Sequence, residues 1–192
     1  WVTTDRKDHP ISGLRGLEEM LREYFVISKS IFRPDISWLA TDTKNITKKN
    51  KILSRYIVLL PGSSKKNPLK RWPYFVDLAK LLISKEYEVI TILGPEELEM
   101  NHSFPGHILK NLDWSQLTGI IKNSYFVVGN DSGPSHIASC LNKKGLALFG
   151  ATTSAVRSEL EREKFKILKV DDLEKLSASE VLKAMVRILN KQ

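Results

Sequence analysis

Hydrophobic and polar residues alternate in blocks from residue 57 onward, and the blocks have the lengths of strands and helices. Short runs rich in β-branched and aromatic residues predict strands. Longer stretches, in which apolar residues recur at three- and four-residue spacing, predict helices. The predicted strands are 57–60, 88–93, 125–128, 146–149 and 165–170, and the predicted helices are 73–85, 114–123, 134–141 and 179–189.

This alternation of strand and helix indicates a parallel sheet covered by helices. We therefore expect an α/β fold, a Rossmann-like parallel sheet with helices on both faces. Ligands of such sheets bind beyond the carboxyl ends of the strands. The loops after Leu60, Leu93, Val128 and Phe149 are therefore expected to line one crevice.

The first 50 residues follow a different pattern. Apolar residues at helical spacing predict an amphipathic helix over 12–25. Residues 34–50 then place Pro, Asp, Ser, Thr, Asn and Lys around isolated apolar residues, which is the composition of a linker between two compact bodies. We predict a domain boundary there, with residues 1–50 separate from residues 51–192.

Composition narrows the class of protein. Thirty Lys and Arg against 22 Asp and Glu leave a net charge of +8, which favours an anionic partner such as a phosphate or an acidic membrane surface. The basic residues occur in short clusters without interleaved aromatic residues, so a nucleic-acid partner is not expected. The lone cysteine, Cys140, cannot form an intramolecular disulfide, and a cytoplasmic location is the default expectation. No segment has the roughly 20 apolar residues of a membrane span.

The most informative segment, residues 126–139, reads FVVGNDSGPSHIAS. It is an apolar run, a turn, and a helix that Pro134 can open. Unpaired N–H groups at such a helix start attract anions, above all phosphate. Two alternatives involve no ligand: Asp131 and Ser132 could merely cap the helix, and His136 could be packed or face solvent.

Other predicted loops at the same edge of the sheet carry matching side chains. These are Ser63, Ser64, Lys70, Glu96, Glu97, Thr152 and Thr153. Hydroxyls, glycine amides and a lysine suit a diphosphate, and a carboxylate suits ribose hydroxyls. Together the loops predict a nucleotide pocket. On charge alone, however, Lys70 and Arg71 would be surface residues, and the two glutamates could only favour a helix start.

Several familiar motifs are excluded. The tetrapeptide DSGP at residues 131–134 resembles the nucleophile segment of trypsin-like proteases, but those are all-β. The sequence has neither GxxxxGK[ST] nor GxGxxG, so the P-loop and the ordinary dinucleotide fingerprint are absent. The four histidines lack metal-ligand spacing, and we expect no metal and no cofactor.

Two ordered segments carry a family resemblance. PGSS and KRWP, near residues 61–73, and VVGNDSGPSHIAS with ALFGAT, near residues 127–152, resemble the C-terminal half of the heptosyltransferases, glycosyltransferase family 9. The resemblance covers about residues 55–190. It implies the C-terminal lobe of a GT-B fold, which binds a nucleotide-diphosphate sugar, usually ADP-heptose. The N-terminal lobe of such enzymes binds a lipopolysaccharide-type acceptor and supplies the catalytic base.

The resemblance assigns the turn a role in donor binding. Asp131, Ser132, Gly133 and His136 match the family's segment that contacts the diphosphate and the sugar. Lys70 matches a lysine that neutralises phosphate. These residues are therefore expected to bind the donor, not to act as an acid–base pair.

The same resemblance assigns the nucleoside side. Ser63 and Ser64 match small hydroxyl residues of the first loop. Glu97 matches an acidic residue that binds ribose, with Glu96 as the register alternative. Leu112 falls where the family packs an apolar side chain against adenine.

The implied reaction is an inverting transfer without a metal, in which an acceptor hydroxyl attacks the anomeric carbon of the donor. The resemblance places no catalytic residue in this chain, because residues 1–50 match only a remnant of the acceptor lobe and the interlobe linker. The expected partners are the donor, a lipid-linked saccharide, a separate N-terminal lobe and the inner membrane as a peripheral contact. Leu60 and the GATTS segment at 150–154 depart from the family pattern. A non-catalytic nucleotide-binding module is therefore the alternative.

Overall fold

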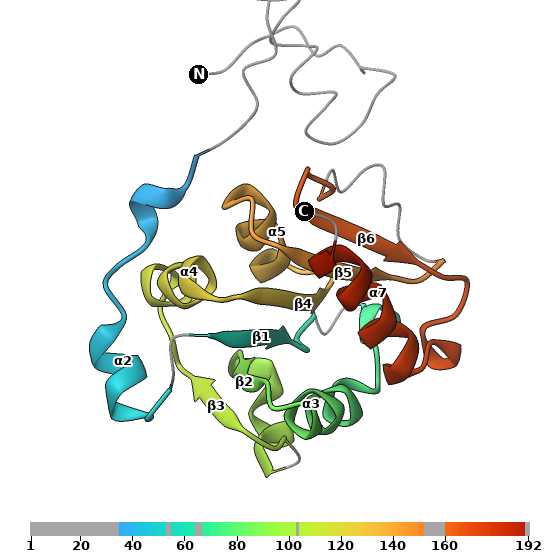
Figure 1. Cartoon of the computed structure of the whole chain (residues 1–192), viewed down its shortest axis with the longest axis horizontal. Coiled ribbons are helices and arrows are strands. Elements are labelled where there is room, and N and C mark those ends of the chain that lie inside the picture. Colours follow the sequence, from blue (N-terminus) through green and yellow to red (C-terminus); the bar gives the residue numbers. More distant parts are fainter. Residues whose placement is uncertain (1–34, 53–54, 64–66, 103, 152–159, 191–192) are drawn as a thin grey trace, which may run out of the picture.

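The computed structural model describes residues 35–190, apart from 53–54, 64–66, 103 and 152–159 (Figure 1). The strands are β1 (Tyr56–Leu60), β2 (Glu88–Leu93), β3 (His107–Lys110), β4 (Phe126–Asn130), β5 (Gly145–Phe149) and β6 (Phe165–Lys169). The α-helices are α2 (Lys44–Lys49), α3 (Phe75–Ser84), α4 (Trp114–Asn123), α5 (Gly133–Cys140) and α7 (Ala178–Asn190). Short 3-10 helices are η1 (Ser37–Leu39), η2 (Pro68–Lys70), η3 (Pro95–His102) and η4 (Leu173–Lys175).

The strands form one parallel sheet in the order β3-β2-β1-β4-β5-β6. Connections from β1 lead outward to β2 and β3, whereas connections from β4 lead outward to β5 and β6. The order therefore reverses between β1 and β4. In open α/β sheets this switch point is where a crevice opens beyond the carboxyl ends of the strands.

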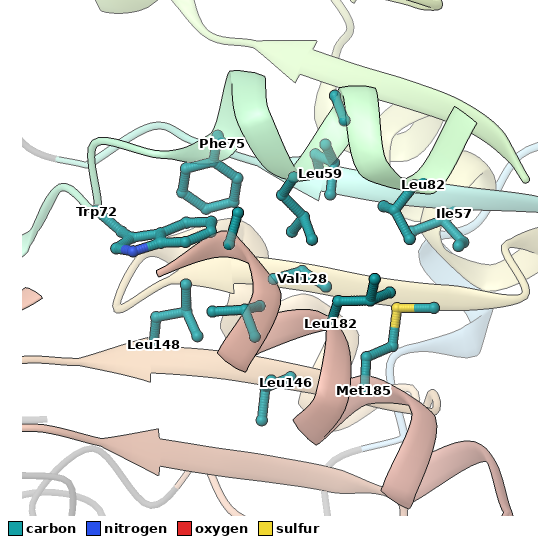
Figure 2. Close-up of a cluster of buried hydrophobic side chains, with 14 of the residues drawn as sticks. Ile57, Leu59, Trp72, Phe75, Leu82, Val128, Leu146, Leu148, Leu182 and Met185 are labelled. Carbon is teal, nitrogen blue, oxygen red and sulfur yellow. The ribbon is translucent and has the colours of Figure 1, made fainter. Parts of the chain in front are cut away.

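Two hydrophobic cores cover the two faces of the sheet. On one face, α3 and α7 pack on Ile57 and Leu59 of β1, and Figure 2 shows Phe75 and Leu82 of α3 and Met185 of α7 in this core. On the other face, α4 and α5 pack against β-strand side chains of opposite parity. Figure 1 shows the two helix pairs on opposite sides of the sheet. The predicted α/β fold with helices on both faces is confirmed.

β1 is hydrophobic along its whole length because of its central position in the sheet. All five residues of β1 are buried, because it lies between β2 and β4 and is covered on both faces. Buried parallel strands read as continuous apolar runs, not as alternating ones. The hydroxyl of Tyr56 donates a hydrogen bond to the carbonyl of Ile120 in α4 at 2.9 Å.

The strands and helices predicted within the described residues agree with the structure to within two residues at each end, and β2 and α4 agree at both ends. The sequence reading missed β3, and it placed only a linker where η1 and α2 occur. The predicted helix over 12–25 lies outside the described residues. Across the described ranges, no helix is both long enough and apolar enough to cross a membrane.

Residues 37–52 pack on the domain through α4. The N–H of Thr41 donates to the carbonyl of Ser115, and Gly119 lets the Thr41 and Thr43 segment approach the helix closely. A Cβ at Gly119 would lie against the Thr41 carbonyl oxygen. This segment is therefore fitted against the surface of α4.

Candidate functional site

A cavity of about 710 Å³ lies at the carboxyl ends of β1, β2, β3 and β4. The sequence-predicted residues that line it are Ser63, Lys70, Glu96, Glu97, Leu112, Asp131, Ser132, Gly133 and His136. Ser64, Thr152 and Thr153 lie outside the described residues. The topology thus brings together side chains that are up to 73 positions apart (from Ser63 to His136) in the sequence.

The loop after β5 contributes less than predicted. Gly150 and Ala151, its described residues, do not line the cavity. A Cβ on Gly150 would instead meet Leu173 of η4 at 3.3 Å. Three of the four predicted loops therefore converge on the crevice within the part of the chain that the structure describes.

Lys70 and Asp131 form an ion pair inside the cavity. The Lys70 Nζ and an Asp131 carboxylate oxygen are 2.6 Å apart, and the two side chains are 24% and 11% exposed. Lys70 ends η2 after β1, whereas Asp131 directly follows β4. The pair spans the switch point, and Lys70 is not the solvated surface residue that charge alone suggested.

Arg71 forms a second pair beside the first. Its Nη2 donates to Glu97 Oε1 at 2.7 Å and to the Ser63 carbonyl at 2.8 Å, and its Nε donates to Ser63 Oγ at 3.2 Å. One guanidinium thus joins the loop after β1 to the residues after β2. The sequence reading treated Arg71 as a surface residue, and only its position beside Lys70 could have pointed to the site.

Glu97 is buried to 5% exposure although it carries a charge. Its Oε2 lies so close to Gly62 and Gly94 that a Cβ would be 2.9 Å away at the first and 2.8 Å away at the second. A Cβ at either position would therefore push the end of the Glu97 side chain aside, so the two glycines let the carboxylate lie close to the backbone. Arg71 occupies Oε1 and leaves Oε2 facing the two glycines.

Asn130, which sequence reasoning missed, ties the loops together. Its Nδ2 donates to the Pro61 carbonyl at 2.7 Å, and its Oδ1 accepts from the N–H of Trp72 at 3.1 Å. The Asn130 carbonyl accepts from Ser135 Oγ at 2.6 Å. Asn130 is completely buried, so these bonds fix the loops after β1 and β4 to each other. Its position between a predicted strand and Asp131 was the only signal.

The start of α5 offers fewer free N–H groups than its sequence suggests. Pro134 has none, and the N–H groups of Ser135 and His136 both reach the Ser132 carbonyl. Ser132 is the N-cap residue but makes no capping bond with its side chain. The exposed backbone of Gly133 is the part of this turn that best suits close contact with an anion.

His136 lies in the first turn of α5 and lines the cavity. Burial lowers the pKa of its imidazole, Asp131 opposes this shift, and the positive charges of Arg162 and Lys70 add to it. His136 is therefore mainly neutral at pH 7. It can donate one N–H to a ligand but does not supply a full positive charge.

The cavity has an apolar end near β2 and β3. Ile92 and Leu93 end β2, and Leu112 and Leu117 flank the start of α4. Trp114, also missed by sequence reasoning, joins them with 62% of its surface exposed. Charged side chains thus come from the loops after β1, β2 and β4, whereas the side chains around the start of α4 are mostly apolar. No cluster of potential metal ligands occurs among the described residues.

Comparisons with known proteins agree with this architecture. The chain is 26% identical over 151 residues to lipopolysaccharide heptosyltransferase 1 of Campylobacter coli, covering 70% of this chain and 44% of the relative. It is 32% identical over 103 residues to lipooligosaccharide heptosyltransferase 2 of Haemophilus influenzae, covering 45% of this chain and 29% of the relative. The chain thus spans less than half the length of these curated relatives.

Solved structures show the same fold. E. coli heptosyltransferase WaaC with ADP superposes with a TM-score of 0.73 at 18% identity, over 96% of this chain and 60% of that one. E. coli ADP-heptose heptosyltransferase II gives 0.66 at 22% identity, over 77% and 50%. The predicted likeness to one lobe of GT-B glycosyltransferases is therefore confirmed for the fold.

The family itself follows from a match along most of the sequence. Residues 19–182 match the model of glycosyltransferase family 9 (heptosyltransferase). The match includes every described candidate residue of the cavity. The chain belongs to glycosyltransferase family 9, the heptosyltransferase family.

Proposed function

We propose that this chain binds the nucleotide-diphosphate sugar donor of a heptosyltransferase reaction, with ADP-heptose or a close analogue as the donor. The observation that carries the proposal is the cavity at the switch point, where a lysine, a turn with exposed glycine backbone and a buried carboxylate converge. This combination suits a diphosphate flanked by a ribose. The relatives named as heptosyltransferases, and the neighbour solved with ADP, support the same ligand class.

The distribution of charge supports an orientation for the donor. The diphosphate is proposed to lie near Lys70, Ser132 and Gly133, where the cation and the exposed backbone are found. The ribose is proposed to meet Glu97, and the adenine to meet Leu112. Ser63, in the loop after β1, is then proposed to contact the donor, and Arg71 holds its side chain in position.

The proposed reaction is a transfer with inversion at the anomeric carbon. An acceptor hydroxyl oxygen forms the new bond to that carbon, the bond to the diphosphate oxygen breaks, and the hydroxyl proton passes to a base. Charge grows on the leaving diphosphate, and we propose that Lys70 and an imidazole N–H of His136, both of which line the cavity, stabilise it. Positioned donors of this kind typically contribute about 3 kcal/mol each.

The base and the acceptor site are proposed to come from another lobe. In this proposal residues 1–50 are the end of that lobe and the linker, and residues 51–192 are the donor domain. The acceptor is a lipopolysaccharide-type saccharide, as the names of the curated relatives suggest. A cytoplasmic enzyme that contacts the inner membrane peripherally fits this acceptor and the charge of +8.

Isothermal titration of the chain with ADP and ADP-heptose tests the proposal. We expect binding of both, and a loss of at least about tenfold in affinity for Lys70→Ala, because a charge-assisted contact is removed. Asp131→Ala is expected to weaken binding as well, since it releases Lys70 from its fixed position.

Matched controls lie on an exposed face of α3. Lys80 and Asp77 form an ion pair at 3.7 Å with 64% and 57% exposure, so Lys80→Ala and Asp77→Ala change charge equally but away from the cavity. Both controls are expected to bind ADP as the unmodified chain does. A folded chain that binds neither ligand would overturn the proposal.

A further inference from the structure

The feature that the proposed function leaves unexplained is Trp114. It is a large apolar side chain that stays 62% exposed, although it lines the cavity. An exposed indole at the edge of a cavity offers a flat apolar face to a ligand, and aromatic residues are common in the lining of ligand pockets. Trp72, by contrast, is 2% exposed and makes edge contacts within the core.

The backbone beneath Trp114 is held firmly. Trp114 is the first residue of α4, directly after the N-cap Asp113. Asp113 accepts from the Gln116 N–H at 2.7 Å, and the Gln116 side chain accepts from the Asp113 N–H at 3.1 Å, which closes a capping box. Thr118 Oγ1 also donates to the Trp114 carbonyl at 2.6 Å. An exposed ring on a fixed backbone is prepared for contact at little entropic cost.

The ring extends toward the turn at the start of α5. Its Cη2 atom lies 3.9 Å from the place that a Cβ on Gly133 would take. Trp114 itself starts from the β3 side, two residues after Leu112. The indole therefore lies between the apolar end of the cavity and the turn that carries Asp131.

We propose that Trp114 is a nucleobase platform, whose indole stacks on the adenine ring of the donor. This inference rests on the proposed function. The base is favoured over the sugar because Trp114 starts beside the apolar side chains of Leu112 and Leu117, which suit a nucleobase better than a sugar. Stacking on an aromatic face suits any purine, so Trp114 adds affinity more than discrimination between purines.

Affinity measurements by titration separate this role from a structural one. Trp114→Ala is expected to weaken ADP binding about tenfold, near the low end of what base–aromatic stacking contributes. Trp114→Phe is expected to stay within about threefold of the unmodified chain, because a flat aromatic face remains. Inorganic pyrophosphate, which has no base, is expected to bind Trp114→Ala and the unmodified chain equally.

The matched control is Trp38→Ala. Trp38 is 80% exposed in η1 but does not line the cavity, so its removal is expected to leave ADP affinity unchanged. Tryptophan fluorescence gives a second readout. ADP is expected to quench the fluorescence of the unmodified chain and of Trp38→Ala, and to quench that of Trp114→Phe much less.

Each contrary result has a distinct meaning. If the unmodified chain binds ADP and Trp114→Ala binds it equally well, the platform is wrong while the proposed function stands. If Trp114→Ala loses equal affinity for ADP and for pyrophosphate, Trp114 has a structural role and the platform is wrong. If only the affinity for ADP-heptose falls, the ring contacts the sugar and not the base. If the unmodified chain binds no ADP, the proposed function fails first.

Discussion

Charged residues in the crevice form ion pairs that cannot be read from the sequence. Consecutive cations, Lys70 and Arg71, pair with carboxylates 61 and 26 positions away. Sequence reasoning identified Asp131, Glu97 and Lys70 as candidates, because hydroxyls, glycines and charges recur at the expected strand ends. It could not find the pairing, or Arg71, because side-chain partners this far apart depend on strand order.

Arg71 gives a prediction about stability. Arg71→Ala removes the cation that satisfies buried Glu97, and we expect unfolding to become easier by about 1–2 kcal/mol, less than for a fully buried pair because the arginine is 30% exposed. Arg71→Lys is expected to recover only part of this loss, since a lysine cannot join Glu97 and Ser63 in the same geometry.

Thermal unfolding by circular dichroism measures the effect. The expected decrease is a few degrees in Tm. Arg187→Ala, on the exposed side of α7, is the matched control and is expected to leave Tm unchanged. A normal Tm for Arg71→Ala would show that Glu97 does not need this partner.

His136 gives a prediction about pH. Its folded-state pKa is lowered from 6.5, chiefly by burial, so the unfolded chain binds a proton more readily than the folded one. Stability rises with pH wherever the unfolded state binds more protons. The contribution of His136 is therefore fully present above about pH 7 and is lost as pH falls through 6.5 toward its lower folded value.

Urea unfolding at pH 7.5 and 5.5 tests this sign. The unmodified chain is expected to lose more stability at the lower pH than His136→Asn, which cannot take up a proton. The comparison between the two chains removes the contributions of all other titrating groups. Equal losses in both chains would contradict the assignment.

Whole elements were easier to predict than single contacts, and the exceptions have physical reasons. β1, β4 and β5 are continuous apolar runs because both faces of the sheet are covered, and such runs are conspicuous. β3 is a short edge strand with His at one end and Lys at the other, so its composition resembled a loop. η1 packs against α4, a contact that the local sequence does not reveal.

Gly119 tests how closely that segment is fitted to α4. Gly119→Ala would raise helix propensity, yet we expect a loss of stability, because the added methyl group meets the Thr41 carbonyl oxygen and the Thr43 side chain. Ser115→Ala on the same helix is the control, since it adds no atom against Thr41.

Limited proteolysis and thermal unfolding give the two readouts. Gly119→Ala is expected to be cleaved faster within residues 37–52 and to melt a few degrees lower. Unchanged cleavage in Gly119→Ala would mean that the segment accommodates the methyl group without leaving the helix.

At the scale of the molecule, the strand order decides what the chain can do. The reversal between β1 and β4 explains why one crevice collects residues from loops spread along the sequence. The hydrophobic pattern predicted the class of fold and the edge at which the site lies. It did not predict how the apolar and charged ends of the cavity are divided, because that depends on which loops become neighbours.

A whole-molecule prediction concerns activity. We expect this chain to bind ADP-heptose but to transfer no heptose, because its proposed role is confined to the donor. Release of ADP in the presence of a lipopolysaccharide acceptor measures transfer, with E. coli heptosyltransferase WaaC as the positive control. Turnover by this chain that disappears in Lys70→Ala would contradict the proposal that the base lies in another lobe.

The ion pair between Lys70 and Asp131 has a further consequence for selectivity. The lysine already has a counter-ion 2.6 Å away, so an arriving anion enters by exchange with the carboxylate or by sharing the lysine with it. A small anion such as inorganic phosphate gains little from that exchange. A ligand that also engages the ribose side and the apolar end gains much more. We therefore expect the crevice to favour a ligand that spans several of its parts over a simple phosphate, while Asp131 keeps Lys70 in position for it.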